Sequence, residues 1–145
     1  RYEPLIAQLK RHEGERLDLH KCPAGYWSIG YGHNLQAKGI SKDIANLILL
    51  EDLADAEEQV RKHIHVKRLS DARLGVLINM AFNLGMHGLL GFKQFLYFLS
   101  MDDYERAADE MLEACVQMFV SLHFFHLLDM ICVHNSKYSE ETLEN

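Results

Sequence analysis

Residues 12–34 are rich in acidic, polar and aromatic side chains, and among them Glu13 has a type suited to acid–base chemistry on a glycosidic bond. Hydrolysis of such a bond needs an acid that protonates the leaving oxygen and a second group that activates water or stabilises the developing cation. The acid must stay protonated near neutral pH, so a glutamate in this role has to be partly buried. We expect such a position for Glu13, although a glutamate at a helix end is more often a solvated surface residue.

A helix and a hairpin are expected to position these side chains. Apolar residues on one helical face predict a short helix over residues 3–12, and Gly14 ends it just after Glu13. Residues 16–20 and 26–31 alternate between polar and apolar, as half-buried strands do. The Cys-Pro-Ala-Gly segment at 22–25 has the composition of a turn between them. Glu13 therefore lies where the helix meets the hairpin.

The aromatic residues of the second strand have two interpretations. Tyr26, Trp27 and Tyr31 form a cluster that could stack on sugar rings. One face of a two-stranded hairpin must also pack on a core, and Trp27, Ile29 and Tyr31 share one face. We therefore expect Trp27 to be a core residue rather than a stacking surface.

The rest of the chain reads as helices. Ser41 is a good N-cap for a long helix over about 42–62, with an apolar stripe formed by Ile44, Leu47, Ile48, Leu53, Ala56 and Val60. Ser70 caps a helix over about 71–84 that ends at Gly85 and is apolar nearly all round, so it should be buried. Further helices are expected near 92–100 and 103–115.

These elements predict an α+β, mostly helical fold in one domain over residues 1–145. We expect two lobes: a small hairpin lobe over about 13–60, and a helical lobe over about 61–134 that includes the N-terminal helix. The long helix connects them, and a cleft between the lobes would be a natural substrate site. Residues 135–145 should form a polar tail.

Several segments in order carry a family resemblance. Eight residues separate Glu13 from Cys22, five separate Cys22 from Ser28, and Ile29-Gly30-Tyr31-Gly32 follows. Two further segments fit: Gly39-Ile40-Ser41 before a long acidic helix, and Asn79-Met80-Ala81-Phe82-Asn83-Leu84-Gly85 with Gly88 and Gly91-Phe92 after it. This pattern resembles the phage lysozymes (tailed-phage endolysins, glycoside hydrolase family 24), and the resemblance covers about residues 3–113.

The resemblance implies roles for individual residues. Glu13 would be the general acid, Cys22 stands where many members have Asp, and Ser28 replaces a Thr whose hydroxyl it keeps. The substrate contacts implied by the resemblance are Gly30, Tyr31, His33, Asn34 and Asn83. The implied activity is that of a muramidase, which hydrolyses the β-1,4 bond between N-acetylmuramic acid and N-acetylglucosamine in bacterial peptidoglycan and so lyses the cell. The alternative is a catalytically impaired descendant that binds peptidoglycan or a protein partner.

Cys22 leaves two interpretations open. A thiol is a poor general base at neutral pH unless its pKa is lowered, and Lys21 beside it could stabilise a thiolate. The alternative is an inert small residue in a turn. Asp18 is the nearest spare carboxylate and is expected to be a solvated strand residue. His20, Cys22 and His33 could gather around a metal, but the resemblance implies neither a metal nor a cofactor.

Charge and cysteine content limit the partners. The formal net charge of −6 argues against a nucleic-acid partner, while residues 1–38 carry +2, which suits an anionic glycan or is ordinary scatter. Three widely spaced cysteines make a poor disulfide framework, and no signal peptide is visible in residues 1–12. We expect a monomer that is made in a reducing cytoplasm and acts on the cell wall, by a release route that the sequence does not indicate.

The family pattern breaks after Glu113. Residues 114–134 are largely apolar, and the chain has no Arg after Arg106. A membrane span is not expected, because polar side chains interrupt a stretch near the minimum length. We expect a buried closing helix that supplies no substrate contact; an alternative C-terminus from a frameshift or a different exon is the rival interpretation.

Overall fold

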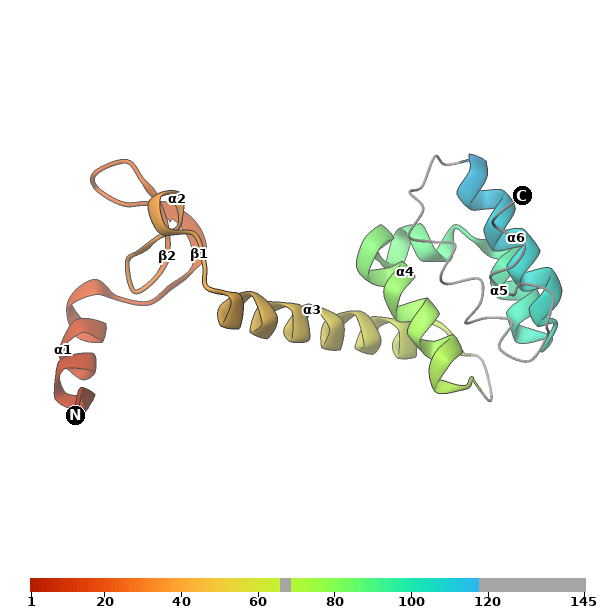
Figure 1. Cartoon of the computed structure of the whole chain (residues 1–145), viewed down its shortest axis with the longest axis horizontal. Coiled ribbons are helices and arrows are strands. Elements are labelled where there is room, and N and C mark those ends of the chain that lie inside the picture. The colour runs from red at the N-terminus through yellow and green to blue at the C-terminus, as the bar shows by residue number, and fades with distance from the viewer. Residues whose placement is uncertain (66–68, 118–145) are drawn as a thin grey trace. The chain divides into compact units, whose positions relative to one another are not determined.

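The structure is a computed structural model of the chain, and it describes residues 1–65 and 69–117. The predicted closing helix over 114–134 extends well past this range, and the predicted tail over 135–145 lies outside it altogether. The described elements, in chain order, are α1 (Glu3–Glu13), β1 (Arg16–Lys21), β2 (Trp27–Gly30), β3 (His33–Asn34), α2 (Leu35–Lys38), α3 (Lys42–His63), α4 (Asp71–Leu90), α5 (Lys93–Ser100) and α6 (Tyr104–Gln117) (Figure 1). The predicted mostly helical α+β class is confirmed.

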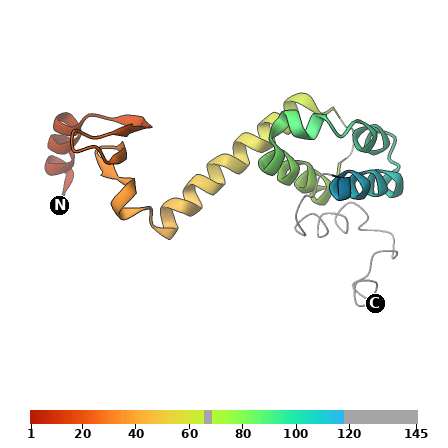
Figure 2. The same ribbon diagram turned by 90° about the horizontal axis from the view of Figure 1, so that it is seen from above.

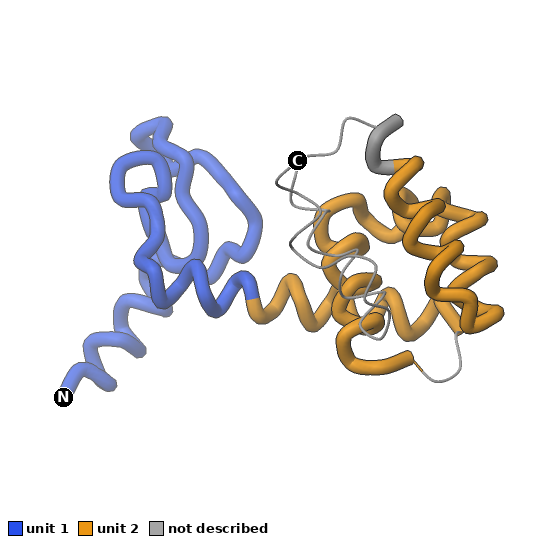
Figure 3. Tube along the Cα trace, turned by 45° about the vertical axis from the view of Figure 1, so that its right-hand side comes forward, with its two compact units in different colours: residues 1–49 blue, residues 50–145 orange. Residues whose placement is uncertain are grey.

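The chain divides into two compact units, Arg1–Leu49 and the residues from Leu50 onward, so the division falls within α3 (Figure 3). The sequence placed the hairpin lobe over 13–60 and grouped the N-terminal helix with the helical lobe. Those lobe bounds stay a prediction, and each unit is described by itself.

A three-stranded antiparallel sheet with the order β1-β2-β3 lies in the first unit. His20 pairs with Ser28 and Ser28 pairs with Asn34, so Ser28 lies on the central strand with a neighbour on each side. The predicted hairpin is confirmed, whereas β3 and α2 were not predicted. Asn34 caps α2, since its Oδ1 accepts a hydrogen bond from Ala37 N at 3.0 Å.

The prediction that Trp27 is a core residue is wrong. Its side chain is 43% exposed, and the Lys21 Nζ lies 5.1 Å from the centroid of its ring. The buried residue of β2 is Ser28, on the other face of the strand, at 1% exposure. Alternation in the sequence separates the two faces of a strand correctly but does not say which one is covered.

Helix α3 begins where the sequence predicted, and the Ser41 Oγ accepts a hydrogen bond from Ile44 N at 3.3 Å. In the second half of its apolar stripe, Ala56 and Val60 are buried. In the first half, Ile44, Leu47 and Ile48 are exposed.

The hydrophobic core lies in the second unit. Ser70 caps α4 by accepting from Arg73 N at 3.3 Å, and the buried residues of this helix confirm its central place. Gly85 has φ 71° and ψ 164°, so the helical backbone breaks at the predicted residue, although a further helical segment continues to Leu90. Helices α5 and α6 lie side by side (Figure 2). The buried apolar residues are Ala56, Val60, Val76, Leu77, Met80, Ala81, Leu89, Phe92, Phe95, Leu99, Ala107, Ala108 and Met111.

In the part of the chain that the structure describes, no individual helix has the length and apolar character needed to cross a membrane. Helices α4 and α5 meet those criteria only when taken together as a pair bent by 99°.

Candidate active site

Glu13 is the last residue of α1, and Gly14 ends the helix there. Gly14 adopts φ 71°, a value that favours glycine, and its N–H donates to Lys10 O at 3.2 Å. The Glu13 carboxyl group lies against the backbone of Gly32: a Cβ built on Gly32 would be only 3.3 Å from Glu13 Oε2. Gly32 has φ +79°. The glycine therefore allows both the turn before β3 and the close approach of the carboxyl group.

The expected burial of Glu13 is not found. Its side chain is exposed in the described structure, so the covering that keeps a general acid protonated is not supplied by its neighbours in residues 1–49. The carboxyl group is positioned by the turn at Gly32 and remains open to an incoming ligand.

Tyr31 is held by contacts with residues on both sides of Glu13 in the sequence. Its hydroxyl donates a hydrogen bond to Glu15 Oε1 at 2.8 Å. The Lys10 Nζ lies 5.1 Å from the centroid of the Tyr31 ring, within the range of a cation–π interaction. Tyr31 thus connects the turn between β2 and β3 with the last turn of α1 and with the residue before β1.

The structure brings Cys22 and Ser28 together. Cys22 begins the hairpin turn, with its N–H donating to Tyr26 O at 2.9 Å and its carbonyl accepting from Gly25 N at 2.8 Å. Hydrogen bonding from the Tyr26 N–H is the largest cause that lowers the pKa of the Cys22 thiol; the N–H groups of Ala24 and Gly25 and the Ser28 hydroxyl act in the same direction, against partial desolvation.

Lys21 does not take the role that the sequence suggested for it. Its ammonium group lies over the Trp27 ring, and the pKa of Cys22 is lowered by donors of the turn and of Ser28 instead. Ser28 is buried, and its hydroxyl hydrogen has two alternative acceptors, Tyr26 O at 3.4 Å and the Cys22 sulfur. The hydroxyl therefore faces the turn that carries Cys22.

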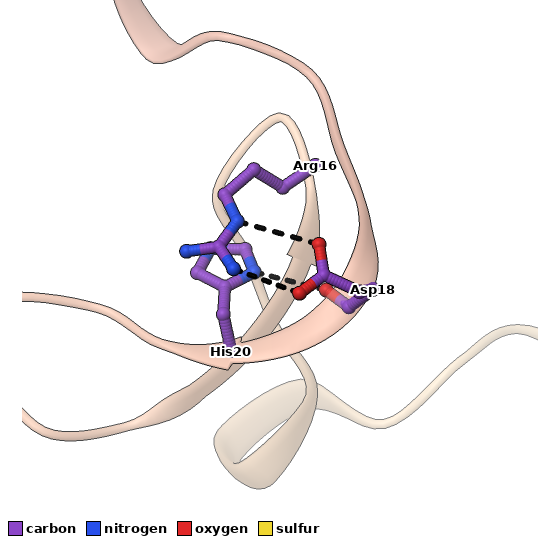
Figure 4. A network of polar contacts seen from close by, with 3 residues as sticks. All are labelled: Arg16, Asp18 and His20. Atoms are coloured by element: carbon purple, nitrogen blue, oxygen red, sulfur yellow. Dashed lines mark hydrogen bonds and ion pairs between the residues drawn. The ribbon is translucent and has the colours of Figure 1, made fainter.

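Asp18 belongs to a separate polar network on β1 (Figure 4). Its Oδ2 accepts from Arg16 Nη2 at 2.7 Å and its Oδ1 from Arg16 Nε at 3.4 Å, which is the main reason that the pKa of Asp18 is lowered. The His20 Nδ1 lies 3.0 Å from Asp18 O, and because a carbonyl only accepts, this nitrogen carries the proton. Asp18 is exposed and ionised in an ion pair, as expected of a solvated strand residue.

The predicted substrate contacts lie at several places. The His33 Nε2 donates to Gly39 O at 2.7 Å, Asn34 caps α2, and Gly30 has φ +67°. Asn83 lies on α4 in the second unit, where its Nδ2 donates to both Asn79 O and Asn79 Oδ1 at 2.9 Å. Their contacts with a glycan stay predictions.

Within residues 1–65 and 69–117, no group of three or more His, Cys, Asp or Glu side chains is arranged to hold a metal ion. Sequence reasoning did not identify two residues that lie beside Glu13: Glu15 and Gly32. Gly32 was named only as part of the Ile29-Gly30-Tyr31-Gly32 segment, and the partner of Glu15 lies sixteen residues away. The alternation of strand residues gave no sign of either contact.

The sequence is similar to known lysozymes and endolysins. The chain is 32% identical to an endolysin of Acyrthosiphon pisum secondary endosymbiont phage 1 over 111 residues, which cover 74% of this chain and 75% of that protein. It is 30% identical to the endolysin of Salmonella phage P22 over 115 residues (74% and 77%), and 26% identical to the probable T4-type lysozyme 1 of Dictyostelium discoideum over 133 residues (71% and 78%). The phage lysozyme family model matches residues 10–117, and the chain belongs to that family.

Proposed function

We propose that the protein is an active muramidase that hydrolyses the β-1,4 bond between N-acetylmuramic acid and N-acetylglucosamine in peptidoglycan. The observation that carries this proposal is the placement of the Glu13 carboxyl group, which lies at the end of α1 against the side-chain-free Gly32. Both residues fall within the part of the chain that matches the family.

In the proposed reaction, Glu13 is the general acid. Its carboxyl proton moves to the glycosidic oxygen as the bond from that oxygen to the anomeric carbon breaks, and the leaving sugar departs as an alcohol. Water completes the reaction by supplying hydroxide to the anomeric carbon and one proton to a base. The exposure of Glu13 leaves its carboxyl group accessible to a polymeric substrate.

Cys22 and Ser28 are proposed to act on the water. A thiol whose pKa is lowered has a larger thiolate fraction near neutral pH than an ordinary cysteine, and a thiolate accepts a proton. The buried Ser28 hydroxyl lies beside the same turn and would orient the water or a hydroxyl of the sugar. Asp18 is not proposed for this step, because Arg16 already engages its carboxylate.

A second candidate is a family member that binds peptidoglycan without cleaving it. Two observations favour it: Glu13 is exposed, and a thiol occupies the position where many members have a carboxylate. In either case the proposed site of action is the bacterial cell wall.

One experiment separates the two candidates. Purified protein is added to a peptidoglycan suspension, and clearing of turbidity, release of reducing ends and co-sedimentation are measured for wild type, Glu13→Gln and Glu51→Gln. Glu51 is an exposed residue of α3 and serves as the matched control. The muramidase proposal expects wild type and Glu51→Gln to release reducing ends and Glu13→Gln to bind without doing so. Binding without release by all three variants would establish the second candidate.

A further inference from the structure

The contacts of Tyr31 point to a role that differs from substrate stacking. We propose that Tyr31 is a positioning residue: it fixes the turn between β2 and β3 against the Glu13 carboxyl group by bonding to Glu15 and stacking with Lys10. This inference rests on the proposed function of Glu13, and it assigns Tyr31 to the geometry of the acid rather than to the glycan.

The first argument is the placement of Tyr31 between two flexible positions. Gly30 and Gly32 flank it, and both have positive φ, at +67° and +79°. Glycine backbones in this region lose much conformational freedom on folding. An anchored side chain between two such glycines restricts the conformations open to the turn, and Tyr31 is that side chain.

The second argument is that the anchors of Tyr31 bracket Glu13. Lys10 lies one helical turn before Glu13 on α1, and Glu15 lies two residues after it. The Tyr31 ring contacts Lys10 and its hydroxyl contacts Glu15. Because Gly32 follows Tyr31 directly and approaches Glu13 Oε2, the same short segment touches the chain before Glu13, at Glu13 and after it.

The third argument is that two groups of Tyr31 already have partners within the chain. The hydroxyl donates its only hydrogen to Glu15, and the ammonium group of Lys10 lies over the ring. Tyr31 as a whole residue is 37% exposed. A positioning residue needs fixed contacts, and Tyr31 has two of them.

Kinetics separate the two roles. A positioning residue affects the alignment of the acid in the transition state more than the binding of the substrate. Tyr31→Phe keeps the ring and removes the hydroxyl. It should lower kcat roughly threefold to tenfold and leave KM within twofold. The substrate is soluble, uncrosslinked glycan strands. Tyr97→Phe removes an exposed phenol of α5 and should leave both constants unchanged. An unchanged kcat for Tyr31→Phe would overturn the proposal, because this variant keeps the ring that could stack on a sugar and loses only the bond to Glu15.

The Glu15 side of the contact has its own test. Glu15→Ala should lower kcat as much as Tyr31→Phe does, and the double variant should be no slower than either single variant, because both remove the same bond. Glu15→Gln keeps an acceptor oxygen and should restore most of the rate. Additive losses in the double variant would contradict the shared bond.

A readout that needs no activity distinguishes failure of this inference from failure of the proposed function. In ¹⁵N-labelled protein, Glu13→Gln should change the chemical shift of the Gly32 amide, because the Glu13 carboxyl group approaches Gly32. The amplitude of this change is then measured in the Tyr31→Phe and Tyr97→Phe backgrounds. Tyr31→Phe should reduce its amplitude by at least half, while Tyr97→Phe keeps it. An unchanged amplitude in Tyr31→Phe would overturn the positioning role. If the protein has no hydrolytic activity but the amplitude is reduced, the proposed function is contradicted and the positioning of the turn by Tyr31 stands.

Discussion

Replacing Gly32 by alanine tests the geometry at Glu13 most directly. The new Cβ would lie 3.3 Å from Glu13 Oε2, tighter than ordinary van der Waals contact, so the carboxyl group must move by a few tenths of an ångström. A 1 Å displacement of a reacting group can cost about 10²-fold in rate, so this shift should lower kcat roughly threefold to tenfold. The positive φ of +79° adds backbone strain of about 1–3 kcal/mol.

Backbone strain from an alanine at positive φ also lowers the stability of the fold. The prediction therefore needs a control variant with an alanine at another glycine of positive φ. Gly85 has φ 71° and ψ 164°, and a Cβ there meets no atom within 4 Å. Gly85→Ala should therefore introduce the same kind of backbone strain as Gly32→Ala, without touching Glu13. For a chain of this size each 1 kcal/mol lowers Tm by about 2–4 °C.

The assay is the initial rate of reducing-end release from peptidoglycan, measured well below the Tm of both variants. We expect Gly85→Ala to retain the wild-type rate and Gly32→Ala to lose activity. Equal rates for the two variants, with Gly32→Ala matching wild type, would show that the contact between Gly32 and Glu13 has no part in positioning the acid.

Three further results are expected. Glu13→Gln should lower kcat by about 10²–10⁴-fold, while its Tm stays that of wild type because the side chain is exposed. Activity within a few-fold of wild type would refute the assignment of Glu13 as the general acid. Alkylation of Cys22 by iodoacetamide, mapped by peptide mass spectrometry, should reach half its maximal rate at a pH below the usual thiol range of about 8.5, because hydrogen bonds lower the pKa of the folded thiol. Ser28→Ala should move that midpoint upward by removing one donor, and an unmoved midpoint would exclude the Ser28 contact. Phe95→Ala should lower the free energy of unfolding in urea by about 3–5 kcal/mol, well beyond the loss for the exposed Phe82→Ala, and equal losses would contradict the assigned core.

The sequence predicted the elements that have strong local signals. Capping serines at 41 and 70 marked the starts of α3 and α4, and Gly85 marked the break in the helical backbone. It did not predict β3 and α2, because two and four residues are too few to show a period. The apolar residues in the first half of α3 are of the same types as those that are buried in its second half. Composition therefore could not predict which half is exposed.

The candidate site also has residues that the sequence predicted and contacts that it did not. Glu13, Cys22 and Ser28 follow from spacing and resemblance, and the structure brings the last two together at the hairpin turn. The contacts of Glu13 with Gly32 and of Tyr31 with Glu15 depend on how the chain folds back over many residues, so no local pattern announces them. The cause of the lowered pKa of Cys22 was also hidden, since backbone N–H groups of a turn leave no trace in residue types.

The way residues 1–49 are held explains why single atoms should matter there. In this unit Ser28 is the fully buried side chain, whereas the apolar core of the described chain begins at Ala56. Burial is non-directional and tolerates small shifts, but a hydrogen bond weakens steeply with distance and angle. The Glu13 region depends on directional contacts: Tyr31 to Glu15, His33 to Gly39, and the approach of Glu13 to Gly32. Removing one hydroxyl from Tyr31 should therefore change the rate more than the stability, whereas removing Phe95 from the second unit should do the reverse.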